Sequence, residues 1–357
     1  MVGAVSAPRK TPSVRLTAWG RPPSLADADV PEPAGTEVLV RVEAAGICHS
    51  DLHVVDAAPG ALPYRIPFTL GHEIAGHVAA LGAEASGLEA GDRVAVHGPW
   101  GCGTCRRCAA GEDNYCDRRT ELAWSGAGLG LDGGMAEHVL VPHARHLVPI
   151  GDLDATQAAP LTDAGLTPYH AVAGLGLAED AAVVVIGAGG LGHVAIQILR
   201  ATTRATVFAV DVREEALALA HRSGAHRTLL AEPGTETELR RSIGKADAVL
   251  DFVGSDPTLA LAAGVLRPGG SLVIVGSGGG RLTVAKPGPL PQGASVSLPF
   301  WGSRRELAEV IALARAGDIR VETELFPLAA AAEAFDRLRA GHVRGRAVLL
   351  PGPLTDS

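Results

Sequence analysis

The stretch AAVVVIGAGGLGHVAIQIL, residues 181–199, decides the fold of this chain. It is long and apolar enough to suggest a membrane span, but it carries His193 and Gln197 beside several glycines. An apolar strand, a tight glycine turn and a buried helix explain the stretch better. The sequence therefore predicts a strand–turn–helix unit here.

The glycines of this turn follow the pattern GxGxxG, which is typical of dinucleotide-binding proteins. The pattern alone is a weak signal, but here it follows an apolar strand, opens a helix and precedes a second strand, TVFAVD. Glycines let a pyrophosphate approach the backbone, and the helix N-terminus supplies N–H groups to it. We predict that the turn binds a cofactor through Gly187, Gly189, Gly190, Leu191 and Gly192.

Asp211, the last residue of TVFAVD, indicates which cofactor binds. A carboxylate at this position can bind the adenosine ribose diol, and it repels a 2′-phosphate. This favours NAD over NADP, although Arg213, two residues later, weakens the preference.

The pattern around the turn predicts the fold class. From about residue 165 onward, apolar strands alternate with helical stretches such as REEALALAHRSG, which is typical of βαβ units and a parallel sheet. Residues 13 to about 150 instead contain short apolar runs separated by glycine and proline, which predicts a mostly β domain. Two helical patterns and a last strand, RAVLL, follow residue 297. We therefore predict an α/β protein of two domains.

Composition and charge exclude several classes of function. The 357 residues are 47% hydrophobic and 20% charged, as in ordinary globular proteins. A net charge of −8 argues against nucleic acid or an anionic membrane as partner, because both require a basic surface. Residues 1–12 lack the apolar core of a signal peptide, so we expect a disordered N-terminal extension and a cytoplasmic protein.

Four of the five cysteines form the cluster Cys102-x2-Cys105-x2-Cys108-x7-Cys116. This spacing lets four thiolates surround one ion and leaves no open position, as in structural zinc sites. An iron–sulfur cluster is the alternative, but the chain offers only one further cysteine. We therefore predict a structural zinc lobe at about residues 100–117.

The remaining cysteine, Cys48, lies in the polar stretch GICHSDLH at residues 46–53, and His72 follows it by 24 residues in GHE. A Cys and a His from separate loops can converge on one metal, with Glu73 beside them. The alternative is a plain strand-to-helix turn in which Ser50 or Asp51 caps the helix.

In combination these motifs resemble the zinc-dependent alcohol dehydrogenases of the medium-chain dehydrogenase/reductase superfamily, over residues 13 to about 352. GHE-x2-G-x5-G-x2-A at 71–85 matches the zinc signature of that family. GPWGCG, LTDAGLTPYH and PFWGSRREL are similar to bacterial NAD-dependent secondary alcohol dehydrogenases. The resemblance implies a GroES-like catalytic domain formed by residues 13–164 and 297–357, and a Rossmann NAD-binding domain at 165–296.

The resemblance also implies a catalytic zinc bound by Cys48, His72 and Asp163, so that each subunit holds two zinc ions. Asp163 stands where many relatives have cysteine, and a turn or N-cap role is the alternative for it. Asp51 is implied to orient His72, and Glu73 to lie beside the metal or to bind it transiently.

Further residues receive roles only through the resemblance. Ser50 and His53 are implied to carry the alcohol proton outward, although secondary alcohol dehydrogenases can have an apolar residue at the outer position. Cofactor contacts are implied for His49, Arg346, Gly254 and Val275, the first two at the pyrophosphate and the others at the nicotinamide. The candidates for the substrate pocket, with ordinary core packing as the alternative, are Tyr64, Trp124, Phe300 and Trp301.

The predicted function is reversible oxidation of a secondary alcohol with NAD. A polyol, aryl-alcohol or aldehyde dehydrogenase of the same superfamily is one alternative, and a zinc- and NAD-binding sensor without turnover is another. A short-chain dehydrogenase is excluded, because no tyrosine has a lysine four residues later. The predicted partner is a small-molecule substrate, and the resemblance implies further copies of the chain, as a homotetramer or homodimer.

Overall fold

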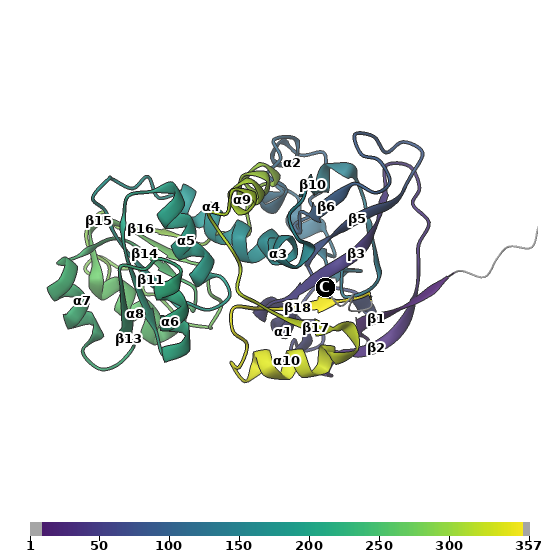
Figure 1. Cartoon of the computed structure of the whole chain (residues 1–357). Coiled ribbons are helices and arrows are strands. Elements are labelled where there is room, and N and C mark those ends of the chain that lie inside the picture. The colour runs from purple at the N-terminus through teal and green to yellow at the C-terminus, as the bar shows by residue number, and fades with distance from the viewer. Residues whose placement is uncertain (1–8, 353–357) are drawn as a thin grey trace, which may run out of the picture. The chain divides into compact units, whose positions relative to one another are not determined.

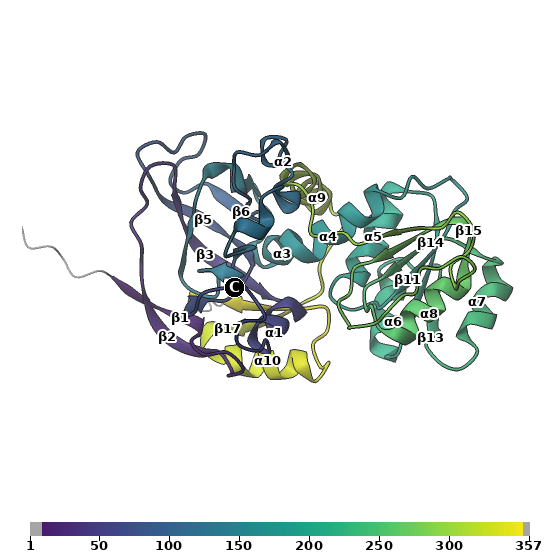
Figure 2. The same ribbon diagram turned by 180° about the vertical axis from the view of Figure 1, so that it is seen from behind.

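The structure is a computed structural model that describes residues 9–352, and the chain forms two compact units (Figures 1 and 2). The first contains the described residues up to Asp163 together with Ser303–Ile311 and residues 323–352. The second contains Ala164–Gly302 and Ala312–Glu322. The predicted second domain ended at residue 296, whereas the structure carries the second unit further, because the strand β16 (Ser295–Ser297) still pairs with the parallel sheet.

A small sheet opens the first unit, with strand order β2 (Ser24–Asp29), β1 (Lys10–Leu16), β4 (Phe68–Thr69). The disordered extension was predicted to reach residue 12, but β1 starts at Lys10, because residues from Lys10 onward pair with β2. Residues 1–8 of that extension lie outside the described residues.

The larger sheet of the first unit brings together distant parts of the chain. Its order is β10 (Leu147–Pro149), β6 (Arg93–Val96), β5 (Glu73–Leu81), β3 (Val38–Ile47), β18 (Arg346–Leu350), β17 (Thr323–Pro327), and β9 (His138–Val141) also pairs with β3. Gly46 of β3 lies opposite Glu73, and Ile47 lies opposite Ala347. The end of β3 and the starts of β5 and β18 therefore meet at the same end of the sheet. The C-terminal strands β17 and β18 are yellow in Figure 1.

Short helices and one small ladder surround this sheet. The α-helices of the first unit are α1 (His49–Val55), α2 (Arg106–Ala109), α3 (Ala155–Pro160) and α10 (Ala331–Arg339), while α9 (Arg304–Ala316) is divided between the units. Single 3-10 turns are η1 (Asp113–Tyr115), η2 (Arg119–Glu121), η3 (Ala144–His146) and η5 (Leu328–Ala330), and β7 (Gly126–Ala127) pairs with β8 (Gly130–Leu131). A π-helical turn, η4 (Leu161–Gly165), follows α3.

The second unit is a parallel sheet, ordered β13 (Arg227–Leu230), β12 (Thr206–Asp211), β11 (Ala182–Ile186), β14 (Ala246–Asp251), β15 (Leu266–Ile274), β16. Counted along this unit, the order is 3-2-1-4-5-6, that of the Rossmann fold. Its helices are α4 (Leu166–Ala173), α5 (Gly192–Thr202), α6 (Glu214–Arg222), α7 (Thr235–Ile243) and α8 (Asp256–Val265). The predicted α/β fold class is thus confirmed.

Apolar side chains of the strands explain why the second unit closes. Val184, Ile186, Val210 and Val249 are at most 2% exposed and form one cluster with residues of the neighbouring helices. Strands buried on both faces read as continuous apolar runs, as VVVI does. Across the described range, no helix has both the length and the apolar character that crossing a membrane requires.

Candidate functional site

Cys48 lies at the junction of β3 and α1, where it is the N-cap of the helix. Its backbone N–H donates to Asp51 Oδ2 at 2.8 Å, and the amide of Asp51 donates back to the Cys48 carbonyl at 3.1 Å. Asp51 thus completes a capping box from the third helical position, but the N-cap is Cys48 and not Ser50 or Asp51 as the plain alternative required. The same carboxylate also reaches His72, so the cap and the site share one residue.

The sequence-predicted ligands lie together. One donor atom each from Cys48, His72, Glu73 and Asp163 falls within 4.8 Å of the others, and all four residues are buried. Cys48 Sγ lies 3.3 Å from Asp163 Oδ2, and His72 Nε2 lies 3.8 Å from the same oxygen. Donor atoms that share a tetrahedral zinc are about 3.3–3.8 Å apart, given bonds of about 2.0–2.3 Å. This donor set therefore fits zinc.

His72 is held in the orientation that ligation requires. Its Nδ1 lies 3.2 Å from Asp51 Oδ1, which leaves Nε2 on the side of Cys48 and Asp163. Burial opposes protonation of the ring, but the carboxylates of Asp51 and Asp163 raise the pKa of His72 well above its usual range. The same negative charges favour a cation among these donors.

Arg346, at the start of β18, supplies the positive charge of the cluster. Its Nε donates to Glu73 Oε2 at 3.0 Å, its Nη2 donates to Glu73 Oε1 and, at 2.8 Å, to Asp163 Oδ2, and the residue is 3% exposed. Burial raises the pKa of Glu73 to about 7, although Arg346 opposes the shift. The pyrophosphate contact implied for Arg346 stays a prediction, since what the structure shows is this buried ion pair.

Sequence reasoning did not find the ion pair of Arg346. A signal was present, because several buried carboxylates and a thiol need a counter-charge, and Arg346 opens a buried strand. Its partners, however, lie 273 and 183 residues away along the chain.

Asp163 lies in the π-helical turn η4, which α4 follows. Such turns are rare, occur mostly as single-turn bulges in helices and are frequent at functional sites. The carboxylate contacts Cys48 and Arg346, and Gly165 occupies the N-cap of α4. Asp163 is therefore not the cap that the alternative interpretation required.

The residues of the predicted proton path lie on α1. Ser50 Oγ is 3.6 Å from Cys48 Sγ, while His49, Ser50 and His53 are exposed. Ser50 and His53 are three positions apart in the sequence (i and i+3), so they share one face of the helix. Their roles stay predictions.

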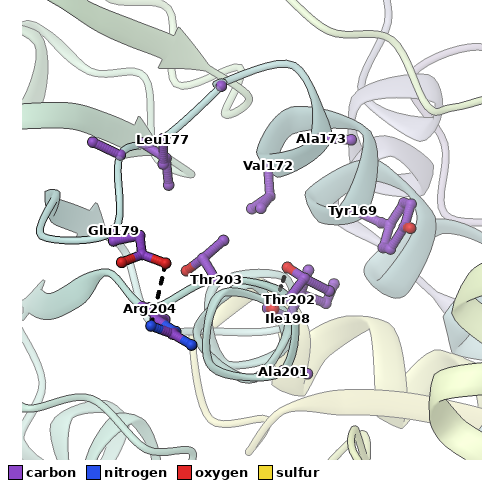
Figure 3. Close-up of a pocket in the computed structure, with 12 residues that line it drawn as sticks. Tyr169, Val172, Ala173, Leu177, Glu179, Ile198, Ala201, Thr202, Thr203 and Arg204 are labelled. Atoms are coloured by element: carbon purple, nitrogen blue, oxygen red, sulfur yellow. Dashed lines mark hydrogen bonds and ion pairs between the residues drawn. The ribbon is translucent and has the colours of Figure 1, made fainter.

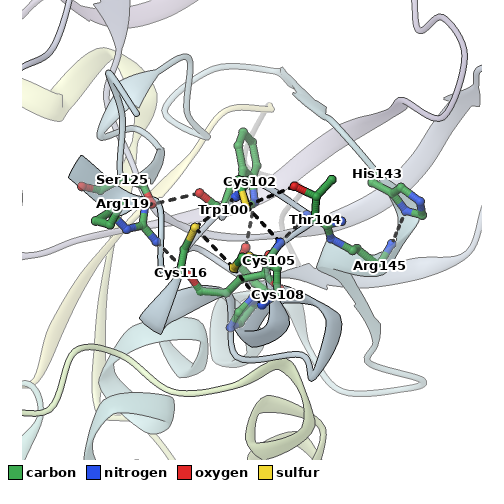
Figure 4. Close-up of polar contacts among 12 residues, drawn as sticks. Trp100, Cys102, Thr104, Cys105, Cys108, Cys116, Arg119, Ser125, His143 and Arg145 are labelled. Carbon is green, nitrogen blue, oxygen red and sulfur yellow. Dashed lines mark hydrogen bonds and ion pairs between the residues drawn. The ribbon is translucent and has the colours of Figure 1, made fainter. Parts of the chain in front are cut away.

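The second cysteine cluster forms a compact lobe (Figure 4). Its four Sγ atoms lie within 4.8 Å of one another. Backbone amides point at the sulfurs: the amide of Cys105 donates to Cys102 Sγ at 3.4 Å, and that of Cys108 to Cys105 Sγ at 3.5 Å. Backbone N–H donors, the amide of Thr104 first, lower the pKa of Cys102 to about 6. The pKa of Cys105 is lowered as well, whereas burial raises that of Cys108. The four convergent sulfurs fit a closed four-sulfur zinc site.

The predicted cofactor turn has the geometry that its glycines permit. Gly187 has φ 84°, and a Cβ at Gly192 would collide with the Gly187 carbonyl. Asp211 Oδ2 accepts from the amide of Ala188 at 2.8 Å, and its Oδ1 accepts from the amide of Arg213 at 3.0 Å. Asp211 therefore braces the turn, and its predicted contact with ribose remains untested.

The two residues predicted to contact the nicotinamide, Gly254 and Val275, follow strands of the same sheet. Gly254 has φ 70° and comes after β14, and the amide of Val275 donates to the Asp251 carbonyl at 2.8 Å. Both positions lie at carboxyl ends of parallel strands, where ligands bind in this fold.

The aromatic candidates for a substrate pocket are divided between the two units. Tyr64 and Trp124 belong to the first unit, and Tyr64 bonds to Ser125 at 2.9 Å. Phe300 and Trp301 belong to the second unit, where their ring centroids are 5.1 Å apart and Trp301 has φ 51°. Their role in a pocket stays a prediction.

A separate depression of about 550 Å³ lies on the second unit, between the ends of α4 and α5 (Figure 3). An ion pair between Glu179 and Arg204, 3.2 Å long, stands at its edge. None of the sequence-predicted site residues lines it.

Comparison with known proteins finds two family domains in this chain. Residues 34–152 match the model of the alcohol dehydrogenase GroES-like domain, and residues 190–316 match that of the zinc-binding dehydrogenase domain. The chain is 40% identical to an NAD-dependent alcohol dehydrogenase of Sulfurisphaera tokodaii, over 95% of this chain and 99% of that protein.

Solved structures are similar over nearly the whole chain. The alcohol dehydrogenase of Aeropyrum pernix has a TM-score of 0.88 and 36% identity, covering 95% of this chain and all of the other. An acetophenone reductase of Geotrichum candidum, solved with NAD, has a TM-score of 0.86 and 32% identity, covering 97% of this chain and 98% of the other.

Proposed function

The chain belongs to the zinc-dependent alcohol dehydrogenase family of the medium-chain dehydrogenases, and from this premise we propose that it oxidises secondary alcohols to ketones, reversibly, with NAD as hydride acceptor. The observation that supports this most is the buried group of Cys48, His72 and Asp163, with the hydroxyl of Ser50 beside the thiol. Three protein ligands leave zinc an open position for substrate.

The residues of the site have separate tasks in this reaction. Zinc, when bound, supplies a Lewis acid that lowers the pKa of an alcohol hydroxyl from about 16 toward about 7. Ser50 takes the alcohol proton and passes it toward the exposed imidazole of His53. Asp51 keeps Nε2 of His72 directed at the metal position, and Arg346 holds the carboxylates of Glu73 and Asp163 in place.

The second unit serves the cofactor. NAD supplies the hydride-accepting nicotinamide, and the turn from Gly187 to Gly192 offers its backbone to the pyrophosphate. The carboxylate of Asp211 favours NAD over NADP. His49 and Arg346 remain proposed pyrophosphate contacts.

A spectrophotometric assay of NADH formation tests the proposal directly. A panel of simple secondary alcohols, with primary, aryl and polyol substrates beside them, is run with NAD and NADP in parallel. We expect the highest kcat/KM for a secondary alcohol with NAD. Turnover of a polyol or an aldehyde instead would assign the enzyme to that substrate class. Absence of turnover in zinc-loaded protein would support a zinc- and NAD-binding sensor.

The similarity to an acetophenone reductase favours the ketone–secondary alcohol couple among these substrates. We further propose that the enzyme acts in the cytoplasm, where thiols such as its five cysteines stay reduced. A homodimer or homotetramer is proposed as well. The edge strand β16 supports this, because its three residues are exposed and offer an unpaired strand edge.

A further inference from the structure

His193 is a buried residue of the second unit for which the proposed reaction has no use. It is 1% exposed and lies on the first turn of α5, directly after the cofactor turn. Its Nδ1 is 2.7 Å from the carbonyl oxygen of Gly189, and its Nε2 accepts from the amide of Glu322 at 3.1 Å. Because a carbonyl only accepts, Nδ1 carries the proton. Two backbone groups therefore fix one neutral tautomer of the ring.

The contact with Gly189 sets the direction of a peptide group in the cofactor turn. The Gly189–Gly190 peptide is trans, so its C=O and its N–H point in opposite directions. The Gly189 carbonyl accepts from the imidazole and, at 3.2 Å, from the backbone amide of His193. Both bonds hold it toward the body of α5, and this directs the N–H of Gly190 out of the helix start. Within residues 9–352, no backbone hydrogen bond of the loops and turns uses that N–H as donor. It is thus available to an anion at the helix N-terminus.

The other ring nitrogen holds the segment Arg320–Glu322, which leads toward β17. Gln197, one helical turn after His193, holds the same segment through both backbone groups of Arg320. Its Nε2 donates to the Arg320 carbonyl at 2.8 Å, and its Oε1 accepts from the Arg320 amide at 2.9 Å. Two neighbouring side chains of α5 therefore anchor this segment, but only His193 also contacts the cofactor turn.

We propose that His193 is a positioning residue for the cofactor pyrophosphate, and that it couples pyrophosphate binding to the order of the segment Arg320–Glu322. Because the Gly189–Gly190 peptide is already oriented in the free protein, less free energy of binding is lost in ordering it when the cofactor binds. When the peptide binds a pyrophosphate, its bond to Nδ1 of His193 becomes more ordered. The bond between Nε2 and the amide of Glu322 then becomes more ordered as well. The inference rests on the proposed function, since it assumes that the turn binds NAD.

Substitutions at residue 193 can separate the two contacts. An asparagine amide nitrogen occupies the place of Nδ1, so His193→Asn keeps the donor to Gly189 and loses the acceptor for Glu322. The longer amide of His193→Gln reaches Glu322 and loses the contact with Gly189. His193→Leu loses both, and Gln197→Ala is the matched control that releases Arg320 without touching the turn.

Calorimetric titration with ADP-ribose, which carries the pyrophosphate, is the first measurement. We expect His193→Leu and His193→Gln to bind about tenfold more weakly than the unmodified chain, which corresponds to one lost hydrogen bond to a charged group. We expect His193→Asn and Gln197→Ala to bind within about threefold of it. Adenosine, which lacks phosphate, should bind all five proteins equally. If the leucine variant does not fold, the ADP-ribose affinities of His193→Asn and His193→Gln are compared with each other instead.

Hydrogen exchange on residues 319–323 is the second measurement. ADP-ribose should slow exchange at Glu322 in the unmodified chain and in Gln197→Ala, but not in His193→Asn. Unchanged ADP-ribose affinity in His193→Gln, or an equal loss for adenosine, would overturn the positioning role. Ligand protection of Glu322 in His193→Asn would overturn the coupling. If the unmodified chain does not bind ADP-ribose or NADH, the proposed function fails instead.

Discussion

Asp163 shows how one residue changes the character of a metal site. A carboxylate oxygen is a harder donor than a thiolate, but zinc accepts both. Here the same oxygen, Oδ2, faces Cys48 and accepts from Arg346. The guanidinium thus fixes the carboxylate before any metal arrives.

Metal analysis of Asp163 variants tests this residue. We expect Asp163→Ala to retain about one zinc per chain instead of about two, because the catalytic site keeps only two protein ligands. Asp163→Cys should retain both ions, since a thiolate replaces the carboxylate. Full zinc occupancy in Asp163→Ala would exclude this residue as a ligand.

Arg346 is the second residue whose removal has a calculable effect. Breaking a buried ion pair from one side leaves the other charge uncompensated, so we expect Arg346→Met to lower the free energy of unfolding by about 3–5 kcal/mol. The double variant Arg346→Met/Glu73→Gln should recover part of the loss, because it removes one of the stranded carboxylates.

Urea unfolding of both Arg346 variants in zinc-depleted protein gives this comparison. Zinc depletion is required because a bound cation would itself compensate the carboxylates. Equal stability of the single and double variants would show that Glu73 does not depend on Arg346.

At the scale of elements, the cysteine lobe combines a four-sulfur group that fits zinc with two arginines that bind its backbone and side chains. Arg119 donates to the carbonyls of Asp113 and Ser125 at 2.9 and 3.1 Å, and Arg145 pairs with the Asp113 carboxylate at 3.2 Å (Figure 4 shows both arginines). These bonds close a segment with little regular structure. A structural zinc contributes folding free energy directly in such segments.

Matched substitutions in the two cysteine sites separate stability from catalysis. We expect Cys105→Ser to lose one zinc and to lower the melting temperature by several degrees, because it opens the four-sulfur site. Cys48→Ala should instead abolish NADH formation and leave the melting temperature nearly unchanged. A Cys105→Ser variant that keeps its melting temperature and loses only activity would contradict the structural role.

The turn η3 makes stability depend on pH through His146. This residue is 1% exposed, its ring lies 5.9 Å from that of Trp100, and its carbonyl accepts from the amide of His97 at 2.7 Å. Burial holds the pKa of His146 well below its usual range, and Arg145 adds to the shift. Below the unfolded-state pKa of about 6.5, the unfolded chain therefore binds more protons than the folded one. The free energy of unfolding then decreases as the pH is lowered.

His146→Phe removes this proton uptake. Between pH 7.5 and 5.5 we expect the unmodified chain to lose about 1 kcal/mol more stability than the variant. Denaturant unfolding at several pH values measures the difference. Parallel curves for the two proteins would show that His146 does not titrate on unfolding.

At the scale of the molecule, most of the fold could be predicted from the sequence. The apolar run VVVI and the glycines after it are local signals, and the structure has β11, the turn and α5 in that order. Helices α7 and α8 were not predicted, although they are at least as long as α6, which was. The start of β1 was placed too late, since only pairing with β2 orders Lys10–Pro12.

The candidate site was less accessible to sequence reasoning. Cys48 and His72 stand in recognisable motifs. Asp163 was predicted as a ligand only through the family resemblance, and Arg346 was predicted to contact the pyrophosphate instead of the carboxylates. What joins these residues is sheet register: β3 ends beside the starts of β5 and β18. A register between segments hundreds of residues apart leaves no local mark in the sequence.

The long sequence separation of β18 from the carboxylates that it compensates has a consequence for the order of folding. Glu73 and Asp163 leave the ribosome long before Arg346, and until β18 docks on β3 their burial would cost several kcal/mol. Residues 164–302 of the second unit, in contrast, are continuous and can begin to fold earlier. The carboxylates of the metal site are therefore compensated only after β18 has docked on β3, so we expect zinc to be captured there after that step and not before it.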